Sequence, residues 1–289
     1  MKRPQWITAG IALASVIILF FVSQGQIFGI KQEASTENHD GHNHAPGEEH
    51  ATISIDTILF HAKENLSPEQ NTRLNFLEKS ISRGDVQDQK VHVYHQLANF
   101  WSDSARVFEP YAWYTAEAAR LENSEKSLTF AAHLFLNNLR AEENPGLKNW
   151  KALQAKDLFE RSLKVNPAND SSEIGLGAVY LYGGIGSPME GIQKIRQVAD
   201  KDPKNIFALM TLGQASIVSG QLDKAIDRFE KVLQVQPQNL EALISLADVY
   251  ERKGDNTHAV ENYRKSLPLI GLPEMKEAVE QRIAELSKK

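Results

Sequence analysis

The 289-residue chain contains no cysteine. This absence excludes disulfide bonds, thiol nucleophiles, thiolate zinc sites and covalent haem attachment through a CxxCH motif. A lipoprotein anchor on a cysteine is excluded as well. The absence does not fix the compartment, because a cysteine-free chain is compatible with oxidising or reducing surroundings. An excess of positive charge is also missing, since the net charge is −5 and no basic face stands out. Nucleic acid is therefore not an expected partner.

The motifs of several common enzyme classes are missing too. The sequence has no GxxxxGK[ST] phosphate loop, no HExxH metalloprotease motif and no GxSxG nucleophile elbow. His92 and His95 are three residues apart on a predicted helix, but a structural zinc site needs about four ligands. We therefore expect a protein that is not an enzyme and that has no cofactor.

The N-terminus carries the longest apolar run. Residues 6–22 read WITAGIALASVIILFFV and contain no charged residue, while Lys2 and Arg3 precede them. This pattern predicts one transmembrane helix, with its N-terminus in the cytoplasm and the rest of the chain exported. The expected location is a bacterial cytoplasmic (inner) membrane, with the C-terminal domain in the periplasm. The alternative is a signal peptide cleaved before Gln26, which would release the domain into the periplasm.

A polar, acidic stretch follows the apolar run. Residues 32–50 hold five Asp or Glu and no Lys or Arg, so this segment alone accounts for a charge of −5. Such a composition predicts a disordered linker. Within it, HDGHNHAPGEEH offers imidazole ligands for a divalent metal at His39, His42, His44 and His50. We favour a solvated spacer, and weak divalent metal binding or metal delivery stays as the alternative.

The C-terminal half repeats itself. Residues 205–238 and 239–272 align with a period of 34 residues. The matching pairs are Leu209 and Leu243, Leu212 and Leu246, Gly213 and Ala247, Gly220 and Gly254, Ala225 and Ala259, and Phe229 and Tyr263. The small residues allow two helices to approach closely, and the aromatic residues fill the space between helix pairs. A 34-residue unit of two helices with a glycine between them resembles the tetratricopeptide repeat.

Weaker copies precede these two. Residues 171–204 and about 125–167 follow the same pattern, the latter with an insertion at 141–149, and about 86–122 is only repeat-like. The resemblance implies an all-α fold, a right-handed superhelix of helical hairpins behind one transmembrane helix. We divide the chain into a cytoplasmic tip and anchor (1–30), the acidic linker (31–51), N-terminal helices with degenerate repeats (52–122), tetratricopeptide-like repeats (123–271) and a capping helix (272–289). Two helices are expected at about 53–65 and 68–83.

The resemblance also implies where a partner would bind. In tetratricopeptide proteins the second, fifth, ninth, twelfth and thirteenth residues of each repeat line a concave groove. The predicted groove residues are Ile174, Tyr182, Phe207, Met210, Gln214, Ile217, Ile244, Asp248, Glu251 and Arg252. This groove would be apolar in its middle and acidic at one end, so an apolar, partly basic segment would fit it. It lacks the Lys/Asn/Arg clamp with which some family members bind a C-terminal carboxylate.

These observations predict a membrane-anchored scaffold or assembly factor of the cell envelope that binds other proteins, such as subunits of envelope or membrane complexes. A further alternative is that residues 52–83 fold back and cover the apolar part of the groove, because large exposed apolar patches are uncommon.

Overall fold

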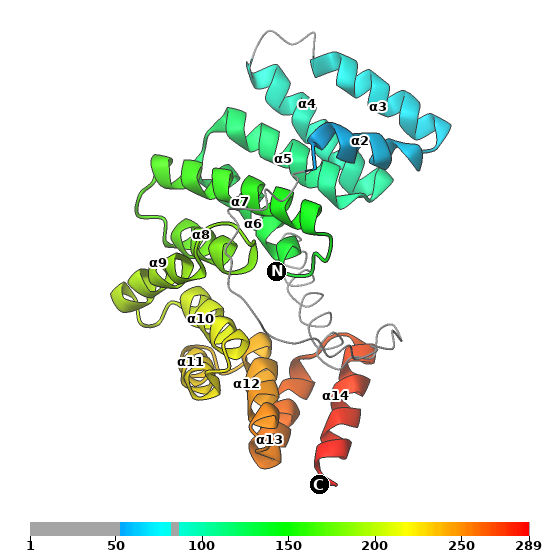
Figure 1. Cartoon of the computed structure of the whole chain (residues 1–289). Helices are drawn as coiled ribbons and strands as arrows, with labels where there is room; N and C mark the ends of the chain where they lie inside the picture. The colour runs from blue at the N-terminus through cyan, green and yellow to red at the C-terminus, as the bar shows by residue number, and fades with distance from the viewer. Residues whose placement is uncertain (1–52, 82–86, 289) are drawn as a thin grey trace, which may run out of the picture.

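The computed structural model describes residues 53–81 and 87–288 (Figure 1). This part of the chain is helical and contains no β-strand, which confirms the all-α prediction. No helix within it has the length and apolar character needed to cross a membrane. The predicted anchor at residues 6–22 lies outside the described residues.

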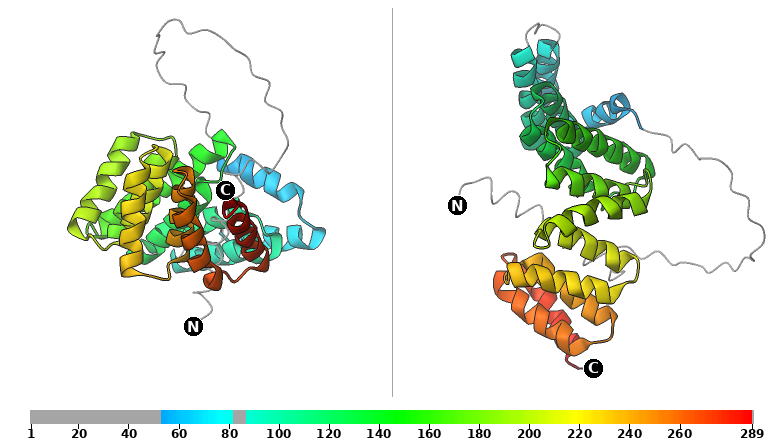
Figure 2. Two further views of the ribbon diagram at one scale, coloured as in Figure 1. Left: turned by 90° about the horizontal axis from the view of Figure 1, so that it is seen from below. Right: turned by 90° about the vertical axis from the view of Figure 1, so that its left-hand side faces the viewer.

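Five helix pairs follow one another along the described chain and form a curved array (Figures 1 and 2). The pairs are α4 (Gln87–Asn99) with α5 (Phe108–Glu122), α6 (Glu125–Leu139) with α7 (Pro145–Val165), α8 (Asp170–Tyr182) with α9 (Pro188–Lys201), α10 (Ile206–Val218) with α11 (Leu222–Val235), and α12 (Leu240–Arg252) with α13 (Asn256–Ser266). A π-helical segment, η1 (Phe100–Ala105), continues α4.

Local sequence explains where the helices begin and turn. Asn169, Asn205 and Asn239 cap the first helices α8, α10 and α12, each accepting a hydrogen bond from the backbone N–H three residues later. Gly220 and Gly254 lie in the turns between paired helices at φ values of 70° and 78°. A side chain would strain the backbone there, so both turns require glycine.

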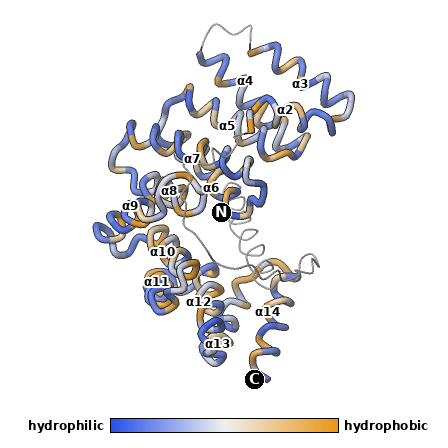
Figure 3. Tube along the Cα trace, in the orientation of Figure 1, coloured by the Kyte–Doolittle hydropathy of each residue, from blue (hydrophilic) through white to orange (hydrophobic). Residues whose placement is uncertain are grey.

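Packing within the pairs depends on small residues. A Cβ atom on Gly191 of α9 would lie 2.4 Å from the carbonyl oxygen of Gly177 in α8, so these helices touch backbone to backbone. In the next pair, the ring of Phe229 in α11 lies over Gly213 of α10. Figure 3 shows hydrophobic and hydrophilic residues alternating along the helices, as expected for amphipathic helices that bury one face.

The ends of the array are closed by additional helices. α2 (Ile55–Glu64) and α3 (Pro68–Ile81) pack on α4, η1 and α5 at the N-terminal end. The apolar clusters around Ile174, Met210 and Ile217 contain no residue of α2 or α3. The alternative in which these helices cover that part of the concave face is therefore wrong.

The C-terminal end is covered by η2 (Leu267–Leu269) and α14 (Pro273–Leu286). Met275, Val279 and Leu286 of α14 are buried against the last pair. Leu272, which precedes the helix as its N-cap residue, is 43% exposed. The capping helix thus removes the stacking face of the last hairpin from solvent.

Candidate functional site

The first helices of the pairs, α6, α8, α10 and α12, contact one another in series. They form the inner side of the curved array in Figures 1 and 2, and we call this side the concave face. The second helices, α7, α9, α11 and α13, lie outside them. The concave face is where the repeat pattern places the partner-binding residues.

Three predicted binding residues are buried instead of presented. Ile174, Met210 and Ile244 are only 1%, 7% and 6% exposed. Each belongs to an apolar cluster shared by neighbouring helices. The cluster of Ile174, for example, includes Val198 of α9 and Leu212 of α10. This corrects the sequence-based assignment: adjacent first helices pack so closely that the fifth position of the repeat is used for stacking.

Other predicted residues keep accessible surface. Tyr182, Phe207, Gln214 and Ile217 are half-buried. The next residue, Val218, is 79% exposed at the end of α10. Gln214 donates a hydrogen bond of 2.9 Å from Nε2 to Ser245 Oγ of α12 and so links two first helices. The apolar surface of the concave face is therefore centred on α10.

His133 of α6 also belongs to this face, although it was not among the predicted site residues. Its ring lies 5.1 Å from the Phe159 ring and 5.5 Å from the Phe207 ring, measured between centroids. Its Nε2 is hydrogen-bonded to Ser171 Oγ at 2.9 Å. Burial lowers the pKa of His133 to about 4, so the imidazole is neutral at pH 7. Ala132 corresponds to the small residues Gly213 and Ala247 of the later repeats. Aligning it with them would have placed His133 at the ninth position of its repeat, which is one of the positions predicted to line the groove.

This imidazole makes the stability depend on pH. The folded-state pKa of His133 is about 4, below the value of about 6.5 expected in the unfolded chain. Below pH 6.5 the unfolded chain therefore binds a proton that the folded protein excludes, and the free energy of unfolding falls toward pH 4, by at most about 2–3 kcal/mol. Urea unfolding between pH 4 and 8 should show a smaller pH dependence for His133→Gln. Identical slopes for the two proteins would contradict the assignment.

The acidic end of the concave face is neutralised by arginines. Arg252 pairs with Asp248 at 3.0 Å, and Arg282 of α14 donates from Nε to Glu251 at 3.0 Å and from a second nitrogen to the other oxygen. Burial raises the pKa of Asp248 and Arg252 opposes the rise. The expectation of an acidic end is therefore corrected, because the capping helix brings a cation that the repeat pattern does not include.

The histidines do not assemble a metal centre in the described part of the chain, where no three His, Asp or Glu side chains converge. His95 Nε2 lies 2.7 Å from Glu122, and His92 Nε2 lies 2.9 Å from Gln96. His39, His42, His44 and His50 lie outside the described residues.

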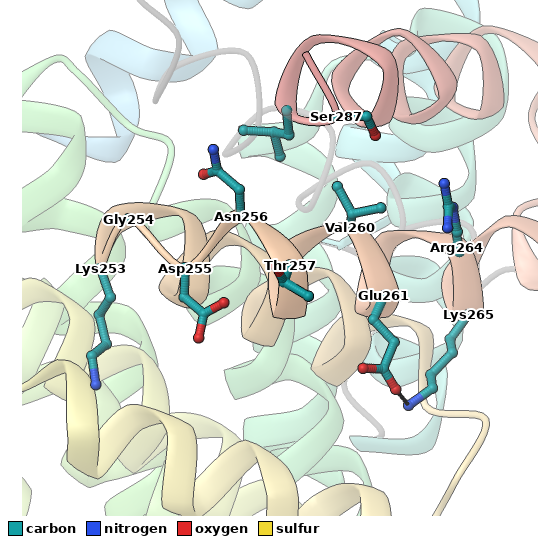
Figure 4. Close-up of a pocket in the computed structure, with 11 residues that line it drawn as sticks. Lys253, Gly254, Asp255, Asn256, Thr257, Val260, Glu261, Arg264, Lys265 and Ser287 are labelled. Atoms are coloured by element: carbon teal, nitrogen blue, oxygen red, sulfur yellow. Dashed lines mark hydrogen bonds and ion pairs between the residues drawn. The ribbon is translucent and has the colours of Figure 1, made fainter. Parts of the chain in front are cut away.

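A separate shallow hollow lies between α13 and the end of α14 (Figure 4). Its side chains carry both charges, and Glu261 pairs with Lys265 at 2.6 Å, four residues later on the same helix. Surface pairs of this kind contribute little to stability or to binding. We assign no function to this hollow.

Comparison with known proteins agrees with this geometry. Residues 240–269 match the family model of the tetratricopeptide repeat. The described fold is similar to the crystal structure of PilW, a widely conserved type IV pilus biogenesis factor (TM-score 0.50, 19% identity, 68% of this chain and 86% of PilW covered). It is also similar to a thermophilic tetratricopeptide repeat protein of Thermus thermophilus (TM-score 0.50, 16% identity, 71% and 100% covered).

A third similar structure is MamA of Desulfovibrio magneticus RS-1 (TM-score 0.43, 24% identity, 64% and 96% covered). No curated protein matches the chain. The family match is confined to residues 240–269, and the first two structures show that the described fold resembles that of tetratricopeptide repeat proteins. The all-helical character and the resemblance to tetratricopeptide superhelices agree with the sequence-based prediction, whose transmembrane helix lies outside the described residues.

Proposed function

We propose that this protein is a membrane-anchored scaffold or assembly factor of the cell envelope that binds a segment of a partner protein on its concave face. The main support is the apolar surface that α10 leaves uncovered, with Phe207 and Ile217 half-buried and Val218 79% exposed. Exposed apolar surface on a folded domain is typical of an interaction site. The similarity in fold to a pilus biogenesis factor is consistent with a role in assembly, by analogy of architecture.

The proposed location is the bacterial cytoplasmic membrane, with residues 6–22 as a single-pass anchor and the repeat domain on the periplasmic side. The uncharged apolar run preceded by Lys2 and Arg3 supports this orientation. Release after cleavage before Gln26 would place the same domain in the periplasm without an anchor.

The partner segment is proposed to be mainly apolar. A basic group on it would meet Glu241, since Asp248 and Glu251 already pair with Arg252 and Arg282. Burial raises the pKa of Glu241 and Arg140 opposes the rise, so this carboxylate lies in a poorly solvated place.

Photo-crosslinking in cells tests the proposal directly. A benzophenone amino acid at Phe207 or Val218 should give adducts to the same protein, identified by mass spectrometry. The matched control is Val235 of α11, which is 40% exposed on a second helix. Equal adducts at all three positions, or none at Phe207 and Val218, would argue against binding on the concave face. Met210 is unsuitable as a probe because it is buried.

A further inference from the structure

A second hollow lies on the outer side of the array, between α9 and α11. The helices α9, α10 and α11 follow one another in Figure 1, and Leu209 and Leu212 of α10 form the apolar floor of this hollow. It lies at the C-terminal end of α9 and along the second half of α11. We call it the outer hollow, because none of the residues proposed to bind a partner on the concave face lines it.

Cations outnumber anions around the outer hollow. Its charged residues are Arg196, Asp200, Lys204, Asp227, Arg228 and Lys231, four cations and two anions that leave a net charge of +2. Asp227 is already paired with Lys231 at 2.8 Å on the same helix. Within the described residues, the other three cations form no ion pair. The outer hollow therefore offers three positive charges against the single carboxylate of Asp200.

Arg228 is a cation that the fold holds in place. Its Nη1 group donates a hydrogen bond of 2.8 Å to the backbone carbonyl of Leu212 and also contacts Ser216 Oγ. Its Nε and Nη2 groups form no hydrogen bond with another described residue. Burial lowers the pKa of Arg228 and the nearby charge of Arg196 lowers it further, while Asp227 opposes the shift. A carboxylate entering the hollow would meet donors already in position and would offset the repulsion between the two arginines.

The sequence contains one segment with the complementary charge. Residues 32–50 carry five carboxylates and no Lys or Arg, and the rest of the chain has no net charge. We propose that residues 33–40 of this acidic linker dock in the outer hollow of the same chain. Glu33, Glu37 and Asp40 would then face the three cations that have no carboxylate partner. This inference goes beyond partner binding on the concave face and does not depend on it.

The distance to the outer hollow selects these carboxylates. Ile53 lies beside the start of α7, because a Cβ atom on Gly146 would come within 2.8 Å of its Cδ1 atom. The outer hollow lies between the next two pairs, at the opposite ends of their helices. The path follows one 14-residue helix such as α9, roughly 21 Å, and crosses about two helix contacts of roughly 8–10 Å each. It therefore measures on the order of 40 Å.

Chain length then divides the acidic residues into two groups. An extended chain spans at most about 3.3–3.6 Å per residue, so at least about 12 residues are needed. Asp40, Glu37 and Glu33 precede the first described residue by 13, 16 and 20 residues and can reach the hollow. Glu48 and Glu49 precede it by only five and four residues and cannot. Attachment to the same chain gives the segment an effective concentration of up to about millimolar, so individually weak pairs suffice.

Docking would shorten the connection to the membrane. With residues 6–22 as the proposed anchor, thirty residues (23–52) separate it from the described fold, and docking of residues 33–40 leaves ten (23–32). Ten residues reach at most about 36 Å, one third of the reach of thirty. The pairs in the hollow are partly exposed to solvent, so salt should weaken them. The linker would thus act as a tether whose length responds to ionic strength.

Zero-length crosslinking of the full-length protein in detergent tests the inference. A water-soluble carbodiimide joins a carboxylate to an amine in contact with it, and mass spectrometry identifies the joined peptides. We expect adducts between Lys204 and Glu33, Glu37 or Asp40. The control amine is Lys224, which is exposed on α11 but does not line the outer hollow. Equal yields of linker adducts at the two lysines would overturn the inference.

A charge reversal and added salt test the role of the arginines. Arg196 is exposed, so Arg196→Glu should keep the circular dichroism spectrum while it replaces an attraction by a repulsion. The yield of Lys204 adducts should fall about fivefold in this variant, and by a similar factor for the unsubstituted protein in about 0.5 M sodium chloride. The matched control is Arg264→Glu on α13, an exposed arginine that also has no ion pair within the described residues. A yield that neither the reversal nor salt reduces would overturn the inference.

Further outcomes identify a different occupant. In a mixture of 15N-labelled and unlabelled protein, peptides joined between the two isotopes would assign the outer hollow to the linker of a second copy and reject docking within one chain. Lys204 joined in cells to an acidic segment of another protein, with no linker adduct in the purified protein, would reject it as well. Adducts from Glu48 or Glu49 alone would contradict the distance argument.

These outcomes are separate from the proposed function. Crosslinking at Phe207 and Val218 reports on the concave face, and none of the residues changed or joined in the outer hollow lies there. Failure of one experiment therefore leaves the other conclusion intact.

Discussion

Lys151→Met should lower the free energy of unfolding by about 3–5 kcal/mol, because it breaks a buried ion network. Lys151 is 1% exposed, and its ammonium nitrogen lies 2.9 Å from Glu109, 2.5 Å from Asn138 and in contact with Glu142. The ammonium also lies 5.4 Å from the Phe108 ring centroid. Removing the cation leaves Glu109 and Glu142 largely buried without their counter-ion, and Glu142 then keeps only backbone partners such as the Asn144 N–H, which donates to it at 2.9 Å.

The network also makes stability sensitive to acid. Although burial opposes it, the hydrogen bond from Lys151 lowers the pKa of Glu142. A lowered folded-state pKa means that this contribution is present above the unfolded-state value and is lost as the pH falls through the folded value.

Urea unfolding followed by circular dichroism measures the effect of Lys151→Met. Lys156→Met on the same helix is the matched control, since Lys156 pairs with Glu160 while both side chains are more than 30% exposed. Such a surface pair contributes about 0–1 kcal/mol. If the two variants lost similar stability, the buried network would not be the cause.

Phe229→Ala is expected to cost about 3–5 kcal/mol as well, because a large buried ring is replaced by a cavity. Phe229 is fully buried and packs in a cluster with Ala225 and Val232 of its own helix and with Ala242 of the next pair. Its ring also lies over Gly213, where a Cβ atom would come within 2.5 Å of it. One side chain therefore holds three helices together.

The control for this variant is Phe130→Ala. Phe130 is 51% exposed on α6, so its truncation removes little buried surface and should cost less than about 1 kcal/mol. Hydrogen exchange should locate the damage, since repeat arrays are stabilised by contacts between neighbouring units. Protection should fall first in α10, α11 and α12. Loss spread evenly over the array would contradict this local assignment.

Much of the fold could be read from spacing alone. Residues of one kind recur 34 positions apart, as in the pairs Gly213 and Ala247, and Phe229 and Tyr263. They recur because every unit packs its two helices in the same way. The predicted helices at about 53–65 and 68–83 correspond to α2 and α3. The insertion at 141–149 was also visible, but its role was not: it carries Glu142 to the buried Lys151.

The binding face was harder to predict. The repeat pattern identifies which positions point inward, but it does not say how closely neighbouring first helices approach. That distance decides whether Met210 is presented or buried, and in the structure it is 7% exposed. The partners of the polar residues also come from outside the repeat unit, as Arg282 of α14 does for Glu251.

The sequence by itself determined the helical class, the 34-residue unit and the absence of cysteine chemistry, because these follow from local periodicity and composition. Only the tertiary structure decided which inward positions are accessible and which polar groups meet. Gln214 of α10 and Ser245 of α12, for example, belong to different helix pairs and are joined by a hydrogen bond of 2.9 Å. Their meeting depends on how neighbouring pairs stack, and no single repeat encodes that arrangement.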